Sequence, residues 1–193
     1  MPTTVTYSLE PAPGMKSSLV GLFLAQLDDQ NKNLTEDTRG LTPEELEWQP
    51  APGMNTIGML LAHIALAEVG WIGAAAKGLE FFKIDELPVR WADSGIPLAP
   101  EAAPPAALHG KDLAFYDDVL SRARAFTRKA LAPLTDADLA RQRSRIRRDG
   151  TEVHYSVRWA LYHVLEHEAG HYGQINLLRH HYRLARAKVE TGH

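Results

Sequence analysis

Apolar residues recur every three or four positions in four long segments of the chain. In the first of these, residues 16–38, the recurring apolar positions are Leu19, Leu22, Phe23, Leu27 and Leu34. Similar spacing occupies residues 56–77, 111–131 and a last segment from 156 to about 184 or beyond. Because this spacing places apolar side chains on one face of a helix with 3.6 residues per turn, it predicts four long amphipathic helices.

Shorter stretches between these segments carry capping and turn signals. In "LTPEELEW", Thr42 can cap a helix and Glu45 completes a capping box. The stretch "LTDADL" at 134–139 repeats this pattern and predicts a second short capped helix. Residues 141–155 alternate in a period of two around an Asp-Gly pair, which predicts a small hairpin.

The order of these segments predicts an all-α four-helix bundle. "TIGMLLAHI" in the second segment weakly resembles "SVRWALYHV" in the fourth, so the chain divides into two helix pairs. A proline-rich connection at 78–110 separates the pairs and is long enough to cross over one end of the bundle. Residues 1–15 form an extended lead and residues 185–193 a tail. We therefore expect a single domain over 1–193.

Composition excludes several classes of protein and of site. Hydrophobic residues make up 45% and charged residues 23% of the 193 residues, as in ordinary soluble domains. The formal net charge of -3 gives no reason to expect binding to nucleic acid or to an anionic membrane. The absence of cysteine excludes disulfides, thiolate metal ligands and a cysteine nucleophile. The N-terminus lacks the pattern of a signal peptide and no uninterrupted apolar run reaches roughly 18 residues, so we expect a cytoplasmic protein.

The fourth segment contains "HVLEHEAGHYGQ", in which His163, His167 and His171 follow one another at intervals of four. Residues four apart lie about 40° apart around a helix axis, so His167 and His171 can bind one ion. His163 lies about 80° from His171 and two turns away, beyond the expected reach of the same ion. Two imidazoles do not make a tight site. His63, among apolar residues of the second segment, is the best candidate for a third ligand.

Each histidine also has an alternative explanation. His63 alone is better explained as a hydrogen-bonded histidine of the core, and the spacing of His167 and His171 arises by chance in any histidine-rich helix. Taken together, these three histidines lie on two helices that are expected to face each other, and this arrangement favours a metal site. Three imidazoles without cysteine select zinc, nickel, iron(II) or manganese, and they leave positions open for water or substrate. We expect His163 and Glu168 to orient the ligands or to transfer protons.

His167, Glu168 and His171 also match H-E-x-x-H, the motif of zinc proteases in which the glutamate is the general base. The surrounding sequence argues against this function. The extended motif of one such group requires Gly and His where this chain has Gln174 and Leu177. No predicted system of strands could hold an extended peptide substrate. A metalloprotease is therefore the weakest of the hypotheses.

The densest basic run of the chain alternates arginine with other residues. An extended strand would place four arginines on one side: Arg141, Arg143, Arg145 and Arg147. Arg145 and Arg147 are candidates for binding a carboxylate or phosphate of a substrate or thiol cofactor, through bidentate contacts. A solvated, salt-bridged edge is the alternative explanation.

Two stretches carry a resemblance to a known family: "WQPAPGMNTIGMLLAHIALAE" at 48–68 and "SVRWALYHVLEHEAGHYGQINLLR" at 156–179. With these stretches and its order of helices, the chain resembles the DinB-like (damage-inducible) superfamily of metalloenzymes from about residue 16 to 184. The most specific part is H-x-x-x-H-x-G-Q-I. The resemblance implies an up-down-down-up bundle, often dimeric, with a divalent ion, commonly zinc or nickel. One histidine of the second helix and two of the last would hold the ion, which by position are His63, His167 and His171.

Characterised relatives in that superfamily are transferases and isomerases that use bacillithiol, mycothiol or glutathione. The resemblance implies a metal-activated thiolate that attacks an electrophilic small molecule, and the lack of cysteine fits an external sulfur. The leading hypothesis is thus a divalent-metal-dependent enzyme, of the thiol S-transferase kind, that activates a thiol or water. The alternative is a non-catalytic metal-binding bundle of the stress response. Expected partners are a small-molecule substrate and, in a homodimer, a second copy of the chain, without nucleic acid or membrane.

Overall fold

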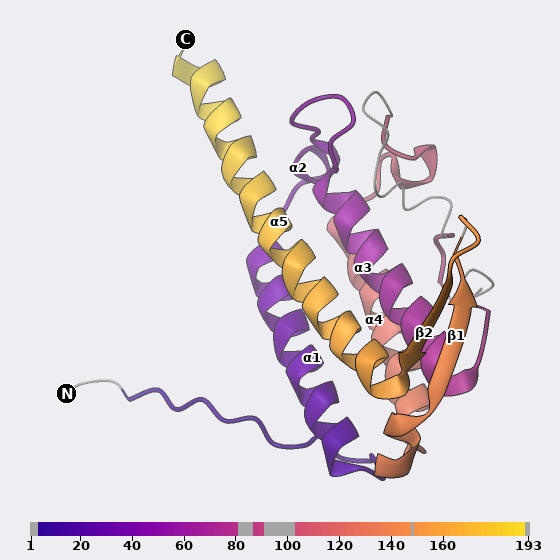
Figure 1. Cartoon of the computed structure of the whole chain (residues 1–193). Coiled ribbons are helices and arrows are strands. Elements are labelled where there is room, and N and C mark those ends of the chain that lie inside the picture. Colours follow the sequence, from indigo (N-terminus) through magenta and orange to yellow (C-terminus); the bar gives the residue numbers. More distant parts are fainter. Residues whose placement is uncertain (1–3, 81–86, 91–102, 148, 192–193) are drawn as a thin grey trace.

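The computed structural model describes residues 4–80, 87–90, 103–147 and 149–191. Its long helices are α1 Ser18–Thr38, α3 Ile57–Ile72, α4 Leu113–Leu131 and α5 Val157–Thr191 (Figure 1). Short helical segments join them: α2 Pro43–Glu47, the π-helical η1 Gly73–Lys77, and the 3-10 segments η3 Ala106–Leu108 and η4 Asp136–Ala140. Strands β1 Gln142–Ile146 and β2 Glu152–Ser156 form one antiparallel pair. The predicted all-α bundle with a small hairpin is confirmed.

Side-chain caps fix where the helices begin. The Ser17 hydroxyl accepts a hydrogen bond from the first turn of α1 at 3.1 Å, and Thr56 does the same for α3 at 3.1 Å. Asp112 caps α4 at 3.0 Å. The predicted capping box of α2 is present, with the Glu45 amide donating to the Thr42 hydroxyl and the Thr42 amide donating to the Glu45 carboxylate. Each cap satisfies an amide that has no partner inside its helix.

The helices run up, down, down and up, as the family resemblance implies (Figure 1). The Lys16 amide donates to the Ala132 carbonyl at 3.1 Å, so α1 begins where α4 ends. Gly58 of α3 faces Tyr116 of α4, so these two helices begin at the same end. At that end the rings of Trp48 and Tyr182 lie 5.6 Å apart, which places the last turns of α5 beside the segment after α2.

The central helix of the bundle is α3, which packs against α2, α4 and α5. The sequence predicts one buried face on this helix, but every residue from Ile57 to Ile72 is buried, because neighbours lie on several sides. The segment Ile57–Lys77 is long and apolar enough to cross a membrane by length and composition, yet it is entirely buried inside the bundle. Fully buried aliphatic side chains of the other long helices complete the core: Leu24, Leu27, Val119, Leu131 and Ile175.

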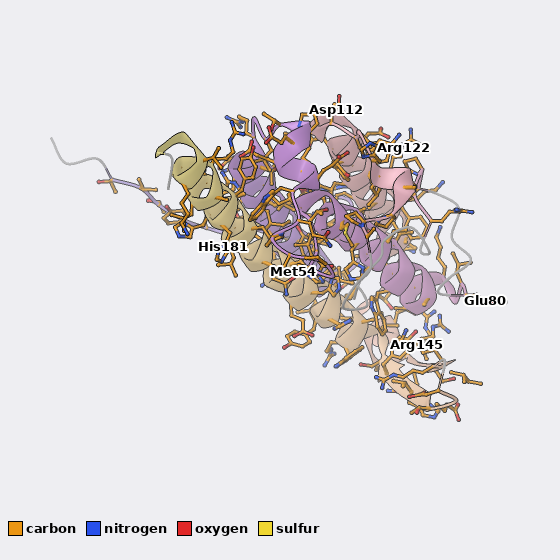
Figure 2. The ribbon with its side chains drawn as sticks, turned by 90° about the horizontal axis from the view of Figure 1, so that it is seen from above. Met54, Glu80, Asp112, Arg122, Arg145 and His181 are labelled. Carbon is orange, nitrogen blue, oxygen red and sulfur yellow. The ribbon has the colours of Figure 1, made fainter. Side chains whose placement is uncertain are left out.

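The hairpin lies at the end of the bundle where α5 begins. Its register sets Arg143 opposite Tyr155 and Arg145 opposite Val153. Gly150, in the turn, has a φ of 83°, a conformation that favours glycine. Figure 2 labels Arg145 on the hairpin and His181 far along α5 toward the C-terminus.

Two sequence expectations need correction or lie outside the described residues. The predicted tail at 185–193 is wrong for most of its length, since α5 continues to Thr191. His180 and His181 are exposed on this helix. Helix propensity of the run after Leu184, rich in Ala, Arg and Lys, explains the extension. The expected crossover at 78–110 is described only in part, because residues 81–86 and 91–102 lie outside the described ranges.

Candidate metal centre

Three histidines from two helices converge inside the bundle. The Nε2 atoms of His63 and His167 are 3.0 Å apart, and those of His171 and His167 are 3.2 Å apart. The ligand atoms of all three residues lie within 4.8 Å of one another. The structure thus brings together the three residues that the sequence nominated as metal ligands.

Helix geometry and packing each supply part of this cluster. His167 and His171 are one turn apart on the same face of α5, as the spacing of four requires. That face packs against α3, where His63 is only 7% exposed among apolar neighbours. The packing of α3 against α5 brings residues that are far apart in sequence to one level of the bundle.

The cluster is electrically neutral at neutral pH. Burial, followed by repulsion from His171, lowers the pKa of His63 to about 4. Burial, followed by repulsion from the neighbouring histidines, lowers the pKa of His167 to about 3. Burial also lowers the pKa of His171, against the effect of a hydrogen bond with Gln174. Neutral imidazoles keep their nitrogen lone pairs available, which is the form that binds metal ions.

The donor set fits a divalent ion. Two nitrogens that each lie about 2.05 Å from one tetrahedral zinc ion are about 3.3 Å apart. Two of the three Nε2 separations, 3.0 and 3.2 Å, are close to that value, and all three ligand atoms lie within 4.8 Å of one another. Three histidine ligands are also the number found in catalytic sites that keep a position open, whereas structural sites use four ligands.

His163 borders the cluster without joining it. Its ring lies 5.8 Å from the ring of His167, between centroids. Its ring stacks on Trp159 with centroids 4.8 Å apart and packs in a T-shaped arrangement with Trp71 at 4.7 Å. Its Nδ1 is 2.8 Å from a carboxylate oxygen of Glu166. The side chain is therefore held in one orientation beside the histidine cluster.

Glu168 lies in a buried ionic cluster and not with the three histidines. Its carboxylate is 3.2 Å from Nη2 of Arg124, whose Nε is 3.0 Å from Glu68. Both glutamates are 2% exposed. Burial, opposed by Arg124 and reinforced by Glu68, raises the pKa of Glu168 to about 8. A zinc protease needs this glutamate beside its metal-bound water, so the geometry lends no support to that hypothesis.

Arg124 is the member of this region that sequence reasoning missed. It also donates from Nη1 to Asp28 at 2.8 Å, and so links α4 to α1, α3 and α5. The signal was present in "LSRARAF", where Arg124 falls on the same helical row as the core residues Leu120 and Thr127. An arginine in an apolar row predicts a buried ion pair, because an unpaired charge there is costly.

The two arginine candidates occupy different places on the hairpin. Arg145 faces the bundle, with its guanidinium carbon 4.5 Å from the centre of the Trp71 ring, and burial lowers its pKa. Through Trp71 it adjoins His163. Arg147 is exposed beside the turn, where its amide donates to the Thr151 carbonyl. Arg148, the last member of the basic run, lies outside the described residues.

Comparisons with known proteins agree with this fold and with the family resemblance. The chain is similar to a solved conserved protein from Enterococcus faecalis, with a TM-score of 0.59 and 17% sequence identity over 83% of this chain and 94% of that chain. At that identity the likeness concerns the fold alone. The search of curated proteins found no match. A family model described as mycothiol S-transferase matches residues 22–183, and that family is DinB-like, which confirms the resemblance found in the sequence. The chain therefore belongs to the mycothiol S-transferase family.

Proposed function

We propose that this protein is a divalent-metal-dependent transferase that activates a low-molecular-weight thiol at His63, His167 and His171. The observation that carries the proposal is the convergence of three neutral imidazoles. Nε2 of His167 lies 3.0 Å from Nε2 of His63 and 3.2 Å from Nε2 of His171. Membership of a family named for mycothiol supports a thiol as the activated group. Zinc and nickel suit such a donor set best, and iron or manganese are the alternatives.

The residues of the chain have separate tasks in this proposal. The three histidines would hold the ion, which when bound supplies a positive charge that lowers the pKa of a thiol or water. His163, fixed by Glu166 and Trp159, would contact the substrate or accept a proton beside the cluster. Glu168 would act indirectly, by holding α5 against α4 through Arg124. Because the chain has no cysteine, the sulfur that attacks the electrophile comes from the thiol.

Metal content and thiol transfer test the proposal together. Protein purified without a nickel column should contain about one divalent ion per chain, and it should conjugate monochlorobimane with mycothiol, bacillithiol or glutathione. His63→Gln and His171→Gln should each lose most of the metal and the activity. His180→Gln, an exposed histidine of the same helix, is the matched control and should retain both. Unchanged metal content in the first two variants would exclude the site.

The alternative function, a non-catalytic metal-binding bundle, is separated by the same experiment. It requires bound metal without turnover for any thiol. It also requires a coordination sphere without exchangeable water, which cobalt-substituted protein would reveal in its visible spectrum. The three-residue donor group favours the enzyme.

We further propose that Arg145 binds an anionic group of the thiol or the electrophile. It lies over Trp71, which contacts His163 beside the cluster. Arg145→Leu should raise the KM for an anionic reactant about tenfold with little change in kcat, because a hydrogen bond to a charged group contributes about 1.5–3 kcal/mol. Arg147→Leu, on the exposed end of the same hairpin, should leave KM unchanged. Equal effects of the two substitutions would count against a specific role for Arg145.

We also propose that the protein acts in the cytoplasm as a homodimer on a small-molecule substrate. α5 carries exposed apolar residues that a second copy could cover: Trp159, Tyr162, Leu177, Leu184 and Val189. Analytical ultracentrifugation of the wild type and of Leu177→Glu tests this association, since a charge in a dimer interface would shift the protein to monomer.

A further inference from the structure

Two histidines of α5 use the same local geometry with different partners. His171 Nδ1 lies 2.8 Å from Oε1 of Gln174, and His163 Nδ1 lies 2.8 Å from Oε1 of Glu166. In both pairs the partner is three residues further along the helix, so the contact is built into α5 itself. The histidine inside the cluster thus has an amide partner, whereas the histidine beside the cluster has a carboxylate partner.

A carbonyl oxygen can only accept a hydrogen bond, so the His171–Gln174 contact requires a proton on Nδ1 of His171. A neutral imidazole carries one ring proton, and Nε2 is then left with a free lone pair. That lone pair is on the atom 3.2 Å from Nε2 of His167. The amide therefore selects the tautomer in which His171 presents an acceptor atom to the cluster.

The choice of an amide instead of a carboxylate has a chemical consequence. A carboxylate partner pulls the Nδ1 proton more strongly and makes the imidazole a more electron-rich ligand. An uncharged amide orients the ring and leaves more positive charge on a bound ion, which is the property that thiol activation requires. Gln174 is exposed, so no packing requirement explains its contact with His171.

We propose that Gln174 is a positioning residue that holds His171 in the Nδ1–H tautomer, so that Nε2 faces the cluster as a moderately electron-donating ligand atom. The inference rests on the proposed metal site for its chemical purpose. The expected tautomer can be measured in the metal-free protein, without any ion or activity.

The experiment compares wild type, Gln174→Leu, Gln174→Glu and the control Gln142→Leu, which makes the same substitution at an exposed position of β1. Long-range ¹H–¹⁵N spectra of metal-free protein report which nitrogen of His171 carries the proton, with His171→Gln used to assign the signal. Competition with a chelator gives the zinc Kd of each variant. Circular dichroism verifies that each variant is folded.

Wild type, Gln142→Leu and Gln174→Glu should show His171 protonated on Nδ1, and Gln174→Leu should shift the proton toward Nε2. Loss of the oxygen acceptor should raise the zinc Kd about 10–100-fold, the usual effect of losing a partner of a ligating histidine. Gln174→Glu should bind zinc at least as tightly as wild type, yet activate a bound thiol less well.

The failure of this inference differs from failure of the proposed function. An unchanged His171 tautomer in Gln174→Leu would overturn the positioning role, whatever the metal content. If wild type binds no zinc but Gln174→Leu still changes the tautomer, the proposed function fails while the role of Gln174 stands. An unchanged zinc Kd with a changed tautomer would overturn the claim that the tautomer matters for the ion.

Discussion

At the scale of single residues, the buried ionic cluster is the least expected feature of the molecule. Arg124 contacts two carboxylates, those of Glu68 and Glu168, that are each 2% exposed. One buried guanidinium cannot fully compensate two buried negative charges. Oε1 of Glu168 also has no hydrogen-bond partner among the described residues. Both facts favour the protonated form of Glu168, in agreement with the rise of its pKa to about 8.

This proton makes stability depend on pH in a defined direction. The folded protein keeps the proton on Glu168 up to about pH 8, whereas the unfolded chain releases it near the ordinary pKa of 4.5. The contribution of Glu168 to the free energy of unfolding is therefore complete below pH 4.5, and it is lost as pH rises toward 8. Glu168→Gln should remove this loss and raise the free energy of unfolding at pH 9 by on the order of 1 kcal/mol.

Urea unfolding at pH 6 and pH 9 measures this effect. The control is Glu10→Gln, the same substitution at an exposed carboxylate before α1, which should not change the difference between the two pH values. A Glu168→Gln variant that is less stable than wild type at pH 9 would show that the carboxylate is ionised and tightly paired with Arg124.

At the scale of elements, the α3–α4 contact depends on a glycine. A Cβ atom on Gly58 would lie 2.7 Å from Cζ of Tyr116, a ring that is 1% exposed. Glycine ordinarily weakens a helix, so its presence in the first turns of α3 reflects this close approach and not a local preference. By contrast, a Cβ on Gly170 of α5 would meet nothing within 4 Å.

Alanine substitutions at these two glycines should have opposite effects. Gly58→Ala should lower the free energy of unfolding by about 1–3 kcal/mol, because the helices must move apart or Tyr116 must leave its rotamer. Gly170→Ala should raise it by up to about 1 kcal/mol through helix propensity. Thermal unfolding of both variants checks the pair, and a stabilised Gly58→Ala would show that α4 can shift without cost.

At the scale of the whole molecule, the candidate metal centre joins helices that are distant in sequence. His63 lies on α3, and its partners His167 and His171 lie about a hundred residues later on α5. The unfolded chain holds no such arrangement, so an ion that binds the cluster stabilises the folded state alone. Metal binding and bundle stability are thereby coupled.

Zinc should raise the melting temperature of chelator-treated protein. At a free concentration of one hundred times Kd, the expected stabilisation is about 2.7 kcal/mol. For a chain of this size that corresponds to a rise of roughly 5–10 °C. His63→Gln should abolish the rise, and His180→Gln should preserve it. A rise of equal size in His63→Gln would mean that zinc binds elsewhere on the chain.

The sequence by itself determined the features that depend on neighbours within a few residues. The spacing of four fixed His167 and His171 on one face of α5, and Thr42 with Glu45 fixed the capping box of α2. Helix and hairpin signals placed the starts of the long helices and the β1–β2 pair within a few residues. These features follow from backbone geometry and local hydrogen bonds, which any sequence stretch carries with it.

Only the tertiary structure decided the features that depend on packing between distant segments. The burial of α3 on every side, the turn of Glu168 toward Arg124 and the placement of Arg145 over Trp71 each require knowledge of which helix or strand lies opposite. His63 was selected from a plausible row of α3, but its distance of 3.0 Å from His167 is set by the packing of α3 against α5. Local periodicity tells which face is apolar; the direction and register of the neighbouring helix decide what that face meets.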